Sequence, residues 1–79
     1  MDSFIKSLVF NLDIYYTIID QDDTTYCLHS NPNGTFIADE GYPPRFYRFA
    51  NADEVYNKFR NAKSIVMSNI ETDEDIVLV

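Results

Sequence analysis

The chain has few of the residues that small proteins use to replace a hydrophobic core or to hold a cofactor. It contains one cysteine, one histidine, two glycines and no tryptophan. Because Cys27 has no internal disulfide partner, core burial has to supply the stability, and a reducing cytoplasm is the expected compartment. Neither Gly34 nor Gly41 stands between a predicted strand and a predicted helix, so a glycine-rich phosphate loop is excluded. We expect no cofactor.

Long apolar runs are also missing. The longest uncharged stretch, residues 24–38, is interrupted by Pro32 and Gly34, whereas a membrane span needs about 20 mainly apolar residues. Asp2 and Lys6 interrupt the beginning of the chain, so we expect no signal peptide. The sequence therefore predicts neither a leader nor a membrane anchor.

What the chain does contain is enough apolar material for one core. Of its 79 residues, 46% are hydrophobic, and six Phe and six Tyr are among them. Disordered chains are poor in such side chains, and two separate cores would need a longer chain. We expect one folded domain, residues 1–79.

β-branched and aromatic residues form several short runs separated by turn formers. The predicted strands are residues 14–19, 24–29, 35–38, 65–70 and 76–79, with a short extended segment at 46–49. Residues 20–23 separate the first run from the second and indicate a hairpin. Asn33-Gly34 favours a type I′ turn between the second and third, and residues 71–75 favour a turn between the last two. The pattern predicts an antiparallel meander followed by two closing strands.

One helix is strongly signalled, and a second is expected at the N-terminus. Asn51 followed by Glu54 forms a capping-box pattern, which predicts a helix over about 52–63. Apolar side chains at helical spacing also mark residues 3–12, although a strand beginning near Leu8 is the alternative. The fold class is therefore α+β: a mostly antiparallel sheet of four to six short strands, one packed helix and a short N-terminal helix. The expected apolar face of the N-terminal helix comprises Phe4, Ile5, Leu8, Val9 and Leu12.

No motif indicates catalysis or metal binding. Cys27 and His29 are two residues apart on a predicted strand, which places them about 7 Å apart on one face, too far for a direct thiolate–imidazole contact without bending. Asp20, Asp22 and Asp23 resemble the start of a calcium loop, but Thr25 stands where the turn glycine should be. We predict a protein that is not an enzyme and has no metal site.

Charge is unevenly distributed along the chain. No basic residue occurs between Lys6 and Arg45, residues 45–63 are net basic, and the tail from Ser64 is acidic again. The net charge is −7. An acidic surface repels nucleic acid and attracts basic protein surfaces. The acidic residues between Lys6 and Arg45 are Asp13, Asp20, Asp22, Asp23, Asp39 and Glu40.

In size, acidity and absence of catalytic motifs, the chain resembles the small inhibitors encoded by phages and mobile elements, including DNA mimics and anti-CRISPR proteins. The resemblance implies a non-catalytic protein that presents acidic turns to a basic groove of a larger protein, such as a nuclease. It also implies that Tyr42 is an aromatic anchor at the interface. The implied partner-binding residues are Asp20, Asp22, Asp23, Asp39, Glu40 and Tyr42.

Two other functions remain open. Residues 45–49 interleave Arg45 and Arg48 with aromatic rings, as single-strand nucleic-acid platforms do, although the net charge opposes direct nucleic-acid binding. Alternatively, the apolar segment 76–79 could form an unprotected sheet edge through which the chain self-associates.

Overall fold

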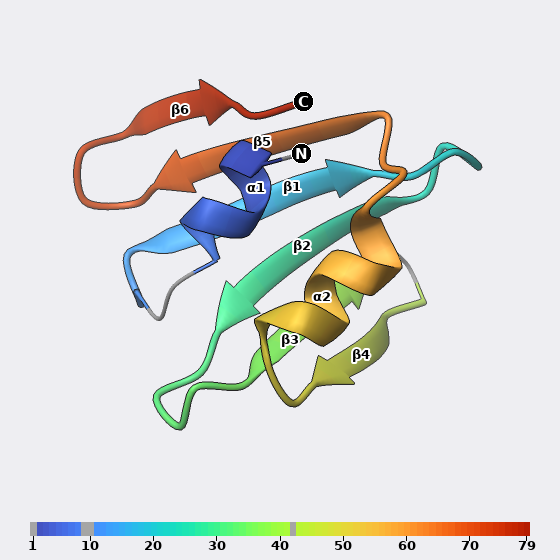
Figure 1. The fold of residues 1–79 in the computed structure, drawn as a ribbon, viewed down its shortest axis with the longest axis horizontal. Helices are drawn as coiled ribbons and strands as arrows, with labels where there is room; N and C mark the ends of the chain where they lie inside the picture. Colours follow the sequence, from blue (N-terminus) through green and yellow to red (C-terminus); the bar gives the residue numbers. More distant parts are fainter. Residues whose placement is uncertain (1, 9–10, 42) are drawn as a thin grey trace.

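The computed structural model describes residues 2–8, 11–41 and 43–79, which form one antiparallel six-stranded sheet with two helices on a single face (Figure 1). The strand order is β4-β3-β2-β1-β5-β6. The α+β fold with its antiparallel sheet is as predicted. The elements are α1 (Asp2–Ser7), β1 (Ile14–Ile19), β2 (Thr25–Ser30), β3 (Phe36–Glu40), β4 (Arg45–Phe49), α2 (Ala52–Phe59), β5 (Ser64–Asn69) and β6 (Glu74–Val77).

The chain path gives the sheet two distinct ends. Strands β1 to β4 form a meander, after which α2 crosses the sheet and returns the chain to β5, which pairs with β1 (Figure 1). The β1–β2 turn, the β3–β4 connection and the α2–β5 loop lie together, and we call this the hairpin end. The opposite end, with residues 11–13 and the β2–β3 and β5–β6 turns, is the distal end.

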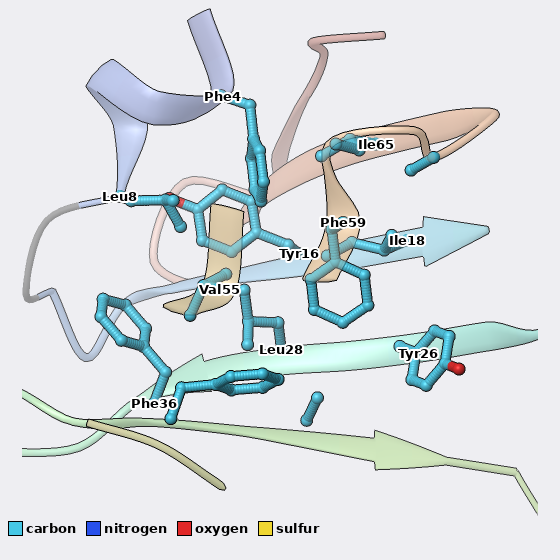
Figure 2. Packing of buried hydrophobic residues seen from close by; sticks show 13 residues of the cluster. Phe4, Leu8, Tyr16, Ile18, Tyr26, Leu28, Phe36, Val55, Phe59 and Ile65 are labelled. Carbon is cyan, nitrogen blue, oxygen red and sulfur yellow. The ribbon is translucent and has the colours of Figure 1, made fainter. Parts of the chain in front are cut away.

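The core lies between the sheet and the helices. Strand residues alternate between the two faces, and the helix-facing set is the buried one. Phe4 of α1 packs edge-on against Tyr16 with ring centroids 5.7 Å apart, and Phe59 of α2 packs against Tyr26 at 5.1 Å (Figure 2). The buried hydrophobic residues are Phe4, Leu8, Tyr16, Ile18, Tyr26, Leu28, Phe36, Ala38, Phe49, Val55, Phe59, Ala62 and Ile65.

The other face of the sheet, which we call the open face, is covered by neither of the two helices α1 and α2 (Figure 1). On it, Tyr15 stacks on His29 with centroids 6.0 Å apart, and His29 is paired across the strands with Ile37. Phe46 and Val77 are also on this face and are 59% and 72% exposed. The open face is thus a mixture of polar groups and exposed apolar side chains.

The N-terminal helix is present but shorter than its apolar spacing suggests. It ends at Ser7, and among the described residues, which leave out 9 and 10, the first strand begins at Ile14 and not near Leu8. Phe4 and Leu8 are buried as expected, whereas Ile5 is exposed, and Leu12 is exposed in a turn beyond the helix. Val9 lies outside the described residues.

Helix α2 begins as predicted and ends early. The Asn51 side chain accepts a hydrogen bond from Glu54 N at 3.1 Å, and Glu54 Oε2 accepts one from Ala50 N at 2.6 Å. The helix ends at Phe59 and does not reach residue 63, because Lys63 N already donates to Ile19 O at 2.8 Å. Residues 60–61 form a turn, and Lys63 already belongs to the pairing with β1.

The first two hairpins share one turn geometry. In the β2–β3 turn, Gly34 N donates to Asn31 O and Asn31 N donates to Thr35 O. The β1–β2 turn has the equivalent bonds, because Asp23 N donates to Asp20 O and Asp20 N donates to Thr24 O. Gly34 has φ 87°, while Asn33 is not in the left-handed region, so the turn is not type I′ as predicted. In both turns only the position of Gly34 needs a positive φ, and in the β1–β2 turn Asp23 occupies that position with φ 63°.

Candidate acidic interaction surface

The β1–β2 turn is rigidly built around Asp20. Its carboxylate accepts hydrogen bonds from Asp22 N at 2.9 Å and from Thr24 N at 3.0 Å, and the Tyr26 hydroxyl donates to it at 3.3 Å. These bonds, that from Thr24 N foremost, hold the pKa of Asp20 below its usual value. Asp20 is therefore ionised, but its carboxylate oxygens already accept hydrogen bonds from within the turn.

The same turn is attached to the α2–β5 loop. Lys63 Nζ lies 2.6 Å from Asp23 Oδ1, and Gln21 Nε2 donates to Asn61 O at 2.6 Å. The side chains of Lys63 and Asp23 are 45% and 76% exposed, so this ion pair contributes little stability. It does neutralise one of the carboxylates expected to meet a partner, and it leaves Asp22 as the exposed acid of this turn that is outside the ion pair.

The two acids at the end of β3 point to opposite faces of the sheet. Asp39 lies on the open face, paired with Cys27 and Phe46. Glu40 lies on the helix face, where its Oε2 accepts a hydrogen bond from the Tyr47 hydroxyl at 2.8 Å, which raises the pKa of Tyr47. The structure brings Glu40 to the hairpin end with the Asp20 turn, but it separates Asp39 from that group. Tyr42 lies outside the described residues.

Basic side chains offset the negative charge of the acids at the hairpin end. Lys58 Nζ lies 4.5 Å from the centroid of the Tyr47 ring and 5.2 Å from that of Tyr26. Desolvation, followed by the charges of Asp20 and Glu40, raises the pKa of Tyr26 to about 12. The acids of this end, which we call the hairpin-end acidic group, are Asp20, Asp22, Asp23 and Glu40. The basic residues at the same end are Arg45, Lys58, Arg60 and Lys63.

A second set of acids, not selected from the sequence, lies at the distal end. Ile70 N donates to Asp13 O at 2.7 Å, which holds Asp13 beside the β5–β6 turn. No basic residue occurs in residues 11–13 or 70–75, and all of these acidic side chains are exposed. We call Asp13, Glu71, Asp73 and Glu74 the distal acidic group. Its members come from two distant parts of the sequence, and only the β1–β5 pairing brings them together.

Cys27 and His29 are closer than predicted. Cys27 Sγ lies 3.2 Å from His29 Nε2 on the open face, and the expected separation of about 7 Å was wrong. Strand spacing fixes the distance between backbone positions, whereas the side chains lean toward each other. Burial and the charge of Asp39 raise the pKa of the Cys27 thiol, which opposes thiolate formation. The contact is thus a thiol–imidazole hydrogen bond without an activated nucleophile.

The segment proposed as a nucleic-acid platform divides between the two faces. Tyr47 and Phe49 turn toward the core, while Phe46 and Arg48 lie on the open face. Stacking platforms expose several rings in a row, and within the described part of this segment only Phe46 is an exposed ring. This arrangement gives little support to single-strand binding.

Groups of metal ligands and membrane-spanning helices are absent from the described part of the chain. Within residues 2–8, 11–41 and 43–79, no three His, Cys, Asp or Glu side chains gather as metal ligands. Neither helix in that part of the chain is long and apolar enough to cross a bilayer. A hollow of 390 Å³ at the hairpin end is lined by Thr24, Thr25, Glu40, Gly41, Pro43 and Arg45.

Comparison with known proteins finds no match for this chain. No protein-family model, no curated protein and no solved structure matches the chain.

Proposed function

We propose that the protein is a non-catalytic cytoplasmic inhibitor that presents acidic turns to a basic groove of a nucleic-acid-handling protein, in the manner of a DNA mimic or an anti-CRISPR protein. The observation that supports this most is the distal acidic group. It is exposed, has no basic residue in its own segments, and belongs to a chain of net charge −7. Such a concentration of one sign steers association with an oppositely charged groove.

The hairpin-end acidic group is the second surface for the same function. Hydrogen bonds hold the carboxylates of Asp20 and Glu40 in place, which lowers the cost of ordering them on binding. The basic residues Arg45, Lys58 and Lys63 at this end reduce its attraction for a basic groove. We therefore expect the distal acidic group to make the leading contact.

The test is a tagged pull-down from bacterial lysate at low and moderate salt, read by mass spectrometry. One variant combines Asp13→Asn, Glu71→Gln and Glu74→Gln. A matched variant, which removes as many charges from the other acids, combines Asp22→Asn, Asp39→Asn and Glu40→Gln. We expect the native chain and the matched variant to retain a basic nucleic-acid-handling protein that the distal variant loses.

The two variants distinguish the question of which acidic surface binds the partner from the question of whether the protein works by presenting acids. If only the matched variant loses the partner, the function stands and the contact belongs to the acids predicted from the sequence. If both variants bind as the native chain does, or if the native chain retains no basic partner, acid presentation is overturned.

A further inference from the structure

The two edge strands of the sheet carry opposite charges. β4 contains Arg45 and Arg48, whereas β6 begins with Glu74 and Asp75. In the described part of the chain, no strand pairs with the outer side of either. The edges also expose apolar side chains, since Phe46 is 59%, Ile76 48% and Val77 72% exposed. Unpaired edges with such side chains are sites where further strands add.

The unpaired backbone groups can be located by following the hydrogen-bond pattern across the sheet. In an antiparallel ladder, residues that bond to one side alternate with residues whose N–H and C=O point to the other. Leu78 N donates to Ile65 O, so Asp75 and Val77 direct their N–H and C=O away from β5. Followed from the bond of Asn31 N to Thr35 O, the same alternation directs the groups of residues 46 and 48 away from β3.

We propose that copies of this chain associate edge to edge, with β6 of one copy pairing antiparallel to β4 of the next. β4 runs toward the distal end and β6 runs away from it (Figure 1). A second copy placed beside the first, in the same orientation, therefore meets it in antiparallel register with the helices of both copies on one face. The outward backbone groups of the two strands then face each other.

The register that aligns the ends of the two strands also matches their side chains. On the open face, Asp75 of one copy lies opposite Arg48 of the next, and Val77 lies opposite Phe46. On the helix face, Ile76 lies opposite Tyr47. Opposite charges and paired apolar side chains at directly opposed positions stabilise an antiparallel ladder.

Charge disfavours the two-fold alternatives. Pairing β6 with β6 brings together two strands that each carry Glu74 and Asp75, and pairing β4 with β4 brings together two that each carry Arg45 and Arg48. Only the mixed pair joins opposite signs. Such head-to-tail contact leaves a free β4 and a free β6 at the ends of every assembly, so growth does not stop at two copies.

Sedimentation velocity over a concentration series tests the proposal. We expect the average mass of the native chain to rise with concentration without a plateau at two copies, and to fall with added salt. Arg48→Glu and Asp75→Lys should each abolish the rise. An equimolar mixture of these two variants should restore it, because every contact in an alternating assembly then joins opposite charges.

Control variants change the same net charge away from the edges. Arg60→Glu and Glu71→Lys should associate as the native chain does. Asp75→Lys also removes the hydrogen bond that the Ser68 hydroxyl donates to Asp75 at 2.7 Å. Should that variant not fold by circular dichroism, the pair Phe46→Ser and Val77→Ser provides the test, since both side chains are exposed and each change should weaken association.

Three outcomes overturn the proposal. The first is a native chain that stays monomeric at all concentrations. The second is a mass that stops at two copies and is insensitive to Arg48→Glu, which indicates two-fold pairing through β6. The third is a folded mixture of the two charge variants that fails to associate, or a pair of serine variants that associates as the native chain does.

Discussion

Two aspartates occupy backbone conformations that favour glycine. Asp23 and Asp73 have φ values of 63° and 60°, in the left-handed region where a side chain is strained. Asp73 is exposed in the β5–β6 turn. We expect Asp73→Gly to raise the free energy of unfolding by about 0.5–1 kcal/mol, because glycine adopts this conformation without strain. Urea denaturation followed by circular dichroism measures the change.

Asp22→Gly is the matched control for this prediction. It removes the same side chain from an exposed turn position, but residue 22 is not in the left-handed region. Glycine there adds only freedom to the unfolded chain, so a loss of stability of up to about 1 kcal/mol is expected. Equal effects of the two substitutions would contradict the assignment of strain to residue 73.

The lowered pKa of Asp20 predicts a pH dependence of stability. A carboxylate whose pKa is depressed by folding stabilises the native state above its unfolded pKa, and this contribution is lost as pH falls through the folded pKa. In Asp20→Asn the contribution is absent at every pH. The stability difference between native and variant should therefore shrink as the pH is lowered from 7 to below about 4. A difference that is constant over this range would show that the turn bonds do not depend on ionisation.

At the level of elements, the N-terminus of α2 depends on one side chain. Asn51 accepts the hydrogen bond of Glu54 N, which otherwise has no partner in the first turn of the helix. Asn51→Ala should cost about 1 kcal/mol of unfolding free energy. The control is Asn57→Ala, at an exposed position within the same helix, where alanine is the better helix former and no loss is expected. Thermal or urea denaturation of both variants decides the question.

The elements themselves were largely predictable because each signal was local. β-branched runs such as residues 14–19 and the capping pair Asn51 and Glu54 report on their own neighbourhood, and the strands and both helices are where such signals placed them. The boundaries of α2 and β6 were set by the residues with which they bond and pair. α2 ends early because Lys63 bonds Ile19, and β6 begins at Glu74 because that residue pairs with Asn69.

The predicted distance between Cys27 and His29 was wrong for a different reason. Strand geometry gives the spacing of the two backbone positions, but it does not give the direction in which two flexible side chains lean. The Tyr15 ring stacked on His29 shows that neighbours on the open face take part in placing the imidazole. Such neighbours come from another strand and are not apparent in the local pattern.

At the level of the whole molecule, charge counted along the sequence differs from charge arranged in space. The acids of residues 20–23 stand in a basic-free stretch of the chain, yet folding places Lys58 and Lys63 beside them. Conversely, Asp13 and the acids of residues 71–74 appear unrelated until β1 pairs with β5. The presence of acidic turns could be predicted from the sequence, but their neutralisation and grouping depended on the order of strands in the sheet.

The β1–β5 pairing also has a kinetic consequence. All other strand pairs in the sheet join strands that are consecutive in the chain, whereas β1 and β5 are separated by the whole meander and α2. Closing that long loop costs entropy before its contacts form, so we expect it to occur in the rate-limiting step of folding. Ile65→Val, at a fully buried position of β5, should therefore mainly slow refolding.

A substitution within the meander should behave in the opposite way. Phe36→Leu alters a buried side chain in β3, which is separated from the β1–β5 pair by β2. We expect β3 to pack after β1 and β5 have met, so this substitution should mainly accelerate unfolding. Stopped-flow measurements over a range of urea concentrations separate the two rates. The meeting of β1 and β5 would then set the time in which the newly made protein acquires its single core, and the outer strands of the meander would pack afterwards.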